Sequence, residues 1–309
     1  MIPGVTNDDL RLAFPWSARF LSILRGVVPD PFTGSHIMVG SDYSGEHRRS
    51  DYRVYSFLLA DADHSPNYPE LRRQLRSELL PNGRRMSYKN LNDRIRQRAL
   101  IPFLNITDSF TGLCCAIVVH KSLERMSTSP SSLSLWQKLN GLEARWNLPA
   151  FEAMARIAHF YCLLLSVVSR PQQHVTWITD QDEIVANDDR LTDVMNFVSK
   201  MSGLYVGHPL GEFAMNSTQV DTGDRAFEDF VAVPDLIAGA FADIVTVWSQ
   251  QPHWSDGGDL TLDIEAIPAK ANEISTWFCK KSSNLKRCTV LIDHFDEHRF
   301  VVQNLDLTK

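Results

Sequence analysis

The chain has 309 residues, of which 44% are hydrophobic and 22% are charged, proportions typical of a folded globular protein and not of a disordered or fibrous chain. A net charge of −6 argues against a generally cationic surface for nucleic acids. The five cysteines have no paired spacing. No secretory signal and no apolar run near the roughly 20 residues of a membrane span are found, so we expect a cytoplasmic protein without a membrane segment.

The first half of the chain is expected to form an N-terminal arm over residues 1–36 and the beginning of a sheet. In chain order the expected elements are a short helix at about 17–27, strands at 37–45 and 52–60, basic helices at 71–80 and about 88–100, and a strand at 113–120. The polar stretch between the first two strands favours a hairpin.

The second half is expected to alternate helices with further strands. The expected elements are a Ser/Pro-rich loop at 127–134, helices at 135–142 and 151–168, a strand at 174–179, a helix at 191–201, an aperiodic flap at 203–224, a strand-like run at 227–233, a helix from 234 to about 248, a helix near 271–279 and a hairpin of 288–293 with 299–302. Because no repeat or change of composition marks a second domain, we expect residues 37–309 to form one α/β domain with a helical insertion at about 125–170.

Three aspartates are expected at the ends of apolar elements. Asp42 ends the first strand, Asp180 directly follows the strand at 174–179, and Asp235 lies in the first turn of a late helix. Carboxylates in such places lose hydration and need a cation or hydrogen-bond donors. If the three converge, a divalent metal would relieve their repulsion, and oxygen-only ligands favour Mg²⁺ or Mn²⁺. Two such ions can activate a water for phosphodiester cleavage.

Each aspartate also fits an ordinary structural role. Asp42 suits a turn, Asp180 suits a capped turn with its acidic neighbours, and Asp235 after proline suits the N-terminus of a helix. The small residues of Ala238-Gly239-Ala240 are expected to let the late helix pack closely against the sheet.

Positive charge is concentrated between Arg72 and Arg98, where eight arginines and one lysine face two acids, a local balance of +7. Two interpretations stay open for this stretch: solvated helix faces, or a surface that follows a phosphate backbone. A smaller cluster is formed by Lys280, Lys281, Lys286 and Arg287.

The order of these motifs resembles the bacterial domain-of-unknown-function 3800 family, over roughly residues 37–245. The family's first motif, commonly Asp-Glu-Ser-Gly, corresponds to Asp42-Tyr43-Ser44-Gly45, in which Tyr43 replaces the glutamate. A strand-end aspartate follows near the middle, and the late motif resembles Pro234-Asp235-Leu236-Ile237-Ala238-Gly239-Ala240. Arg85-Met86-Ser87-Tyr88-Lys89 also looks similar to the family, although less specifically.

The resemblance implies a ribonuclease-H-like fold, a five-stranded mixed β-sheet flanked by helices, here with helical insertions and a C-terminal hairpin. It implies that Asp42, Asp180 and Asp235 bind two Mg²⁺ or Mn²⁺ ions and carry catalysis. Further candidate carboxylates are Glu46, Asp182 and Glu183, and candidate contacts to nucleic acid are Arg48, Arg49, Arg84, Arg85 and Lys89.

The sequence therefore predicts a divalent-metal-dependent nuclease that hydrolyses nucleic-acid phosphodiesters, with RNA and DNA both open as substrates. The alternative is a catalytically silent ribonuclease-H-like module that binds nucleic acid or a partner protein. The oligomeric state does not follow from the sequence.

Overall fold

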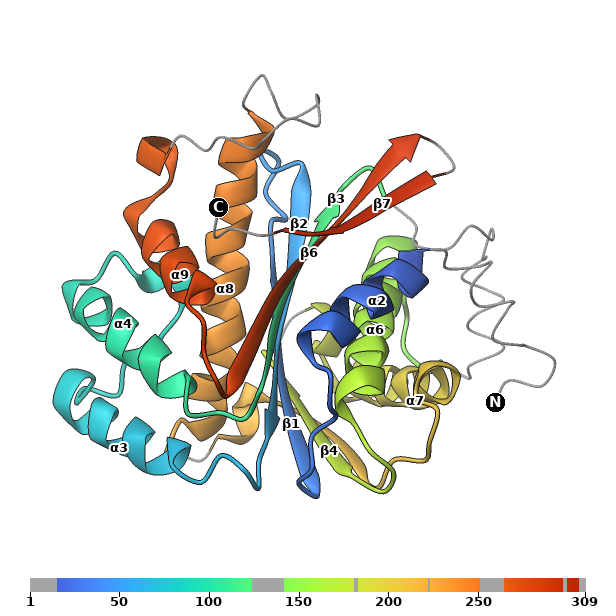
Figure 1. The fold of residues 1–309 in the computed structure, drawn as a ribbon, viewed down its shortest axis with the longest axis horizontal. Helices are drawn as coiled ribbons and strands as arrows, with labels where there is room; N and C mark the ends of the chain where they lie inside the picture. Colours follow the sequence, from blue (N-terminus) through green and yellow to red (C-terminus); the bar gives the residue numbers. More distant parts are fainter. Residues whose placement is uncertain are drawn as a thin grey trace.

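A computed structural model describes residues 16–123, 142–180, 183–221, 223–250, 264–296 and 299–305. The start of the N-terminal arm, the loop expected at 127–134 and nearly all of the helix expected at 135–142 lie outside these ranges. The described residues form a seven-stranded mixed sheet with helices on both faces (Figure 1). The α/β class is thus confirmed, with seven strands in place of the five that were expected.

The sheet has the strand order β5-β4-β1-β2-β3-β6-β7. Its members are β1 (His36–Ser44), β2 (Tyr52–Asp61), β3 (Gly112–His120), β4 (His174–Thr179), β5 (Phe213–Ser217), β6 (Leu285–Asp296) and β7 (Arg299–Asn304). Strands β1, β2 and β3 are antiparallel neighbours, β4 and β5 continue parallel to β1, β6 is parallel to β3, and β7 pairs antiparallel with β6. Strands β1, β3, β4, β5 and β6 therefore all end at the same edge of the sheet.

Helices cover the two faces of the sheet as separate layers (Figure 1). One layer contains α2 (Trp16–Val27), α6 (Leu148–Val168) and α7 (Asp188–Tyr205), and the other contains α3 (Tyr68–Leu79), α4 (Arg94–Thr107), α8 (Ala226–Ser249) and α9 (Ala269–Cys279). Short 3₁₀ turns are η1 (Tyr88–Asn90), η2 (Glu183–Val185), η3 (Thr218–Val220) and η4 (Ile264–Ala266). Each layer encloses its own apolar core against the sheet.

Helix α8 departs most from the expectation. Residues 227–233 were expected as a strand and Pro234 as the start of a helix, but α8 is continuous and contains Pro234. The apolar run reflects burial on nearly every side of this helix, which removes the helical periodicity from the sequence. Asp235 therefore lies well inside a helix, and the expectation that it occupies the first turn was wrong.

A glycine on β1 lets α8 approach the sheet closely. A Cβ atom at Gly40 would lie 2.9 Å from a ring carbon of Phe230 on α8 and 3.5 Å from the backbone oxygen of that residue. The turn of α8 that contacts β1 is the one just before Pro234, whose ring cannot donate the helical hydrogen bond to the Phe230 carbonyl.

Most other expected elements are confirmed with shifted ends. The hairpin of the first two strands, the strands at 113–120 and 174–179, the buried helix at 151–168 and the C-terminal hairpin are all present. The helix expected at about 88–100 is instead the turn η1 followed by α4. The flap expected at 203–224 was wrong in part, because this segment contributes the edge strand β5.

Two helices, α6 and α8, are long and apolar enough to cross a membrane by length and composition. In each case 78% of the apolar window is buried within the fold. Buried to this extent, they have the hydrophobicity of helices in a protein core.

A buried ion cluster joins α3 to α8. Arg72 Nη1 donates to Asp229 Oδ2 at 3.0 Å, and Arg76 Nε donates to the same oxygen at 2.5 Å. The second oxygen of Asp229 accepts from Arg76 Nη2, while Arg72 also contacts Asp224. The side chains of Arg72 and Asp229 are only 3% and 1% exposed, so each charge has lost its water and is stabilised by the opposite charge instead.

Replacing Asp229 by Asn should therefore destabilise the fold strongly, because it leaves Arg76 without its anion and the buried Arg72 with Asp224 alone. We expect the free energy of unfolding to fall by about 3–5 kcal/mol, measured by urea denaturation. The matched change Glu70→Gln breaks an exposed ion pair with Arg73 and should cost less than about 1 kcal/mol. Equal effects of the two substitutions would contradict this account of the cluster.

Candidate active site

Asp42 and Asp180 come from neighbouring strands and share one face of the sheet. The last paired residues of the parallel strands β1 and β4 are Ser41 and Thr179, so Asp42 and Asp180 occupy the next position of each chain. Backbones of adjacent strands are about 4.8 Å apart. Side chains alternate along β1, where Gly40 faces α8, so Asp42 also points to the α8 side.

Both oxygens of Asp180 have hydrogen-bond donors. Arg85 Nη2 donates to Oδ2 at 2.5 Å and Thr218 Oγ1 donates to Oδ1 at 2.7 Å. Burial lowers the pKa of Arg85, but the hydrogen bond and charge of Asp180 outweigh it and raise the pKa overall. Arg85 Nε is buried and has no hydrogen-bond partner among the described residues, so one donor of this guanidinium is unused.

Asp235 approaches the same group from α8. The backbone N–H of Tyr88 donates to its Oδ2 at 2.7 Å. The pKa of Asp235 is raised to about 6, chiefly by burial; the charge of Asp180 acts in the same direction, and the Tyr88 hydrogen bond, Arg85 and Lys89 act in the opposite direction. A carboxylate that remains under-compensated beside a second carboxylate can hold a proton or a cation near neutral pH.

Tyr88 fixes the loop that carries Arg85 onto α8. Its backbone N–H contacts Asp235, its ring lies over Gly239, and its hydroxyl donates to Asp243 at 2.5 Å. Asp235, Gly239 and Asp243 are spaced by four residues and form one stripe along the helix. A Cβ atom at Gly239 would lie 2.3 Å from the Tyr88 ring. This glycine therefore makes room for Tyr88, whereas the sequence had suggested that it makes room for the sheet.

Lys270 on α9 completes this attachment from the other side. Its ammonium nitrogen lies 4.0 Å from the centre of the Tyr88 ring and donates to the Tyr88 carbonyl at 3.2 Å. Burial, together with the hydrogen bond to Asp243, raises the pKa of Tyr88. Neither Lys270 nor Thr218 was expected at the site, because each joins it from a segment with no motif of its own.

Among the further candidate carboxylates, Glu46 is the one whose side chain the structure describes, and it does not join the site. Glu46 lies in the turn after β1, pairs with Arg53 at 2.9 Å, and has a side chain that is 75% exposed. Asp182 lies outside the described residues, as does the side chain of Glu183 in η2. Arg48 lines a shallow hollow beside Glu46, and Arg49 is exposed on the same turn.

Much of the basic stretch is neutralised within the fold. Arg84 and Arg96 both pair with Asp93, Arg85 pairs with Asp180, and the pairs of Arg72 and Arg76 with Asp229 are buried. Lys89, which was also predicted to contact nucleic acid, is exposed, and its positive charge lowers the pKa of Asp235.

Tyr43 lies on the opposite face of the sheet from Asp42. Its hydroxyl forms a 2.8 Å hydrogen bond with Ser41, and its ring packs against Tyr55 and Phe57 in the core beneath α6. An acid in this position would also point away from Asp235, since alternation sends adjacent residues to opposite faces. The absence of an acidic side chain at position 43 therefore removes nothing from the face that Asp42 shares with α8.

Taken over the described part of the chain, no three His, Cys, Asp or Glu side chains are grouped so that they could hold a metal ion. Arg85 supplies the positive charge beside Asp180 in this arrangement. The ligand atoms present are nevertheless oxygens only, and the charge of Asp235 is compensated only in part, which suits a hard divalent cation such as Mg²⁺ or Mn²⁺. The residues fit such an ion provided that Arg85 releases Asp180.

No protein-family model matches the chain, and the search of curated proteins also found no match.

The raised pKa of Asp235 makes the stability of the protein depend on pH. Because the folded state holds this proton more tightly than the unfolded chain does, stability should fall as pH rises from the ordinary value of 3.8 through about 6. Asp235→Asn removes the penalty and should raise the free energy of unfolding by about 1–3 kcal/mol above that range, with no gain below about pH 4.

Urea denaturation across this pH range is the measurement. Glu273→Gln, at an exposed position of α9, removes one carboxylate elsewhere and should show no such pH-dependent gain. A gain for Asp235→Asn that is equally large at low pH would show that the effect does not arise from ionisation of this residue.

Proposed function

We propose that the protein is a divalent-metal-dependent nuclease of ribonuclease-H-like fold, acting in the cytoplasm on RNA or DNA. The observation that carries this proposal is the approach of two carboxylates from separate elements, Asp180 after β4 and Asp235 on α8, with the pKa of Asp235 raised to about 6. Like charges are brought together at a cost that a bound cation would offset.

The strand arrangement supports the proposed fold. The ribonuclease-H-like arrangement consists of three antiparallel strands with two further strands added parallel to the first, and β1, β2, β3, β4 and β5 follow that order. Strands β6 and β7 would then be an extension beyond β3. The proposed resemblance to the domain-of-unknown-function 3800 family rests on the same elements, since its motifs fall on β1, after β4 and on α8.

Asp180 and Asp235 would hold a Mg²⁺ or Mn²⁺ ion, with Asp42 as the neighbouring carboxylate on the same face. Such an ion, when bound, acts as a Lewis acid toward a phosphoryl oxygen and makes a bound water more acidic. Tyr88 orients the Asp235 carboxylate through its backbone N–H, and Thr218 orients that of Asp180. Arg85 and Lys89, in the loop between α3 and α4, would contact the phosphate backbone.

Arg85 would exchange partners when the site is loaded. In the structure its guanidinium satisfies Asp180, with Nε unused. A cation on Asp180 would repel Arg85, and an arginine released beside a phosphodiester is well suited to bind its oxygens through paired N–H donors. Lys89 would add a second positive charge on the same loop.

A catalytically silent binding module is the second candidate. The ion pair between Arg85 and Asp180 favours it, because a carboxylate already neutralised by an arginine needs no metal. The two candidates differ in whether the aspartates bind divalent ions.

Nuclease activity with Mn²⁺ is the direct test of the first candidate. We expect the wild type to cleave single- or double-stranded RNA or DNA, and Asp180→Asn and Asp235→Asn each to lower the rate by about a hundredfold or more. Glu273→Gln should retain the full rate. Activity that is equal in the wild type and both aspartate variants would exclude these residues as the catalytic site.

Titration of Mn²⁺ by calorimetry tests the role of Arg85. Because Arg85→Ala removes the cation that competes for Asp180, it should bind Mn²⁺ up to about tenfold more tightly than the wild type. Arg84 is the neighbour of Arg85 in the sequence and pairs with Asp93. Arg84→Ala breaks that pair and should leave the Mn²⁺ affinity unchanged. Absence of Mn²⁺ binding in both the wild type and Arg85→Ala would favour the silent binding module.

A further inference from the structure

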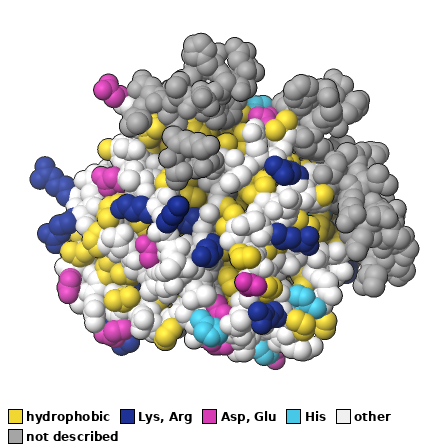
Figure 2. All heavy atoms as spheres, viewed as in Figure 1, with side chains coloured by type: hydrophobic (Ala, Val, Ile, Leu, Met, Phe, Trp, Pro, Cys, Tyr) yellow, Lys and Arg dark blue, Asp and Glu magenta, His cyan; other side chains and the backbone are white. Residues whose placement is uncertain are grey.

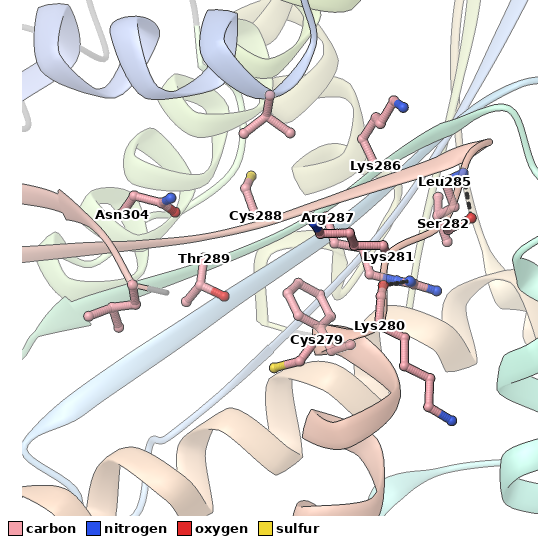
Figure 3. Close-up of a pocket in the computed structure, with 13 residues that line it drawn as sticks. Cys279, Lys280, Lys281, Ser282, Leu285, Lys286, Arg287, Cys288, Thr289 and Asn304 are labelled. Carbon is pink, nitrogen blue, oxygen red and sulfur yellow. Dashed lines mark hydrogen bonds between the residues drawn. The ribbon is translucent and has the colours of Figure 1, made fainter. Parts of the chain in front are cut away.

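A cationic hollow, separate from the aspartate site, lies where the ends of α2, α9 and β7 meet the first half of β6 (Figure 3). Its volume is about 430 Å³, within the usual range for small-molecule sites. It forms because β7 pairs with β6 only from Val290 onward, so the start of β6 pairs with β3 on one edge, while its other edge faces the helix ends and no described strand. The aspartates lie at the opposite ends of the parallel strands.

The hollow is cationic, and none of its lining residues is acidic. Lys280 and Lys281 follow the end of α9, and Lys286 and Arg287 lie on β6. Among the residues that the structure describes, none of the three lysines forms an ion pair, in contrast to most arginines of the basic stretch. In a chain with a net charge of −6, the three lysines are a local concentration of positive charge, and the face drawn in Figure 2 carries several Lys and Arg side chains.

Arg287 is a firmly held part of the lining of this hollow. Its side chain is 5% exposed, pairs with Asp108, donates to the Lys280 carbonyl at 2.6 Å and lies 4.1 Å from the centre of the Trp277 ring. Its Nε is buried and has no hydrogen-bond partner among the described residues. A fixed guanidinium with an unused donor is a pre-organised feature of anion sites.

The lysines are spread apart in the structure. Figure 3 shows Lys286 and Lys280 extending in opposite directions with Arg287 between them, while Thr289 and Asn304 lie toward the other side of the view. Alternation along β6 sends Lys286 to the face covered by α2 and Arg287 to the face covered by α9, so the lysines flank the strand from both sides. A multiply charged anion would draw these flexible side chains inward. The remainder of the lining includes apolar atoms of Val27, Phe278 and Leu305, which inorganic phosphate alone would not cover.

We propose that this hollow binds a phosphate-bearing nucleotide unit, with the phosphates on Lys280, Lys281 and Lys286 and the less polar part of the nucleotide against the apolar lining. The ligand is either a free nucleotide or a terminal nucleotide of a single strand, since both present the same chemistry. The site uses none of the aspartates and does not depend on the proposed nuclease activity.

The test is equilibrium binding, in EDTA, of two probes to the full chain: ADP and a short 5′-phosphorylated oligothymidylate. We expect the wild type to bind one or both, with affinity that falls as salt rises. Lys281→Glu and Lys286→Glu should each weaken binding about tenfold or more. Both residues are exposed, so their substitution should leave the thermal melting curve unchanged.

Arg170→Glu is the matched control, because it makes the same charge change at an exposed site before β4 and should bind as the wild type does. Binding of ADP would identify a free nucleotide as a sufficient ligand, and binding of the oligonucleotide alone would identify a strand end. The proposal is overturned if neither probe binds, or if the lysine variants and Arg170→Glu are weakened equally. It is also overturned if Asp235→Asn abolishes binding while the lysine variants retain it, because binding would then belong to the aspartate site.

Discussion

Helix α8 places three carboxylates in or beside the core, and the hydrogen-bond donors and positive charges that stabilise them come from a single earlier segment of the chain. Asp229 is neutralised by Arg72 and Arg76, while Tyr88 donates to Asp235 through its N–H and to Asp243 through its hydroxyl. Burying an ionised carboxylate without such partners would cost several kcal/mol. The position of this segment, and with it the contact of Arg85 with Asp180, therefore follows from the need to satisfy α8.

The sequence was sufficient for the elements whose local pattern matches their environment. Short apolar runs with β-branched residues located β3 and β4, and a continuous apolar run with a helical length located α6. It failed at α8, where burial on all sides removes the period and Pro234 suggested a start. It also failed at β5, a short edge strand whose pairing with β4 is set by tertiary contacts and not by its own residues.

The same division holds for the candidate site. Residues at strand ends, such as Asp42 and Asp180, could be singled out because the end of an apolar strand is visible in the sequence. The partners could not, because Arg85 is 95 residues from Asp180 and Tyr88 is 147 residues from Asp235. The excess of positive charge between Arg72 and Arg98 suggested an external surface. Much of this charge is instead neutralised in ion pairs with aspartates that are distant in sequence.

The separation between the arginines and α8 has a consequence during synthesis. Arg72 and Arg76 lie 157 and 153 residues before Asp229, so the ribosome completes the cationic segment long before its buried counter-charge exists. Contacts so distant along the chain form late and slow the folding of a domain. Until α8 emerges, the nascent chain presents a strongly positive segment next to ribosomal RNA. A fragment that ends before residue 226 would therefore keep this cationic segment, with its local balance of +7 between Arg72 and Arg98, without the buried aspartate that neutralises part of it in the finished protein.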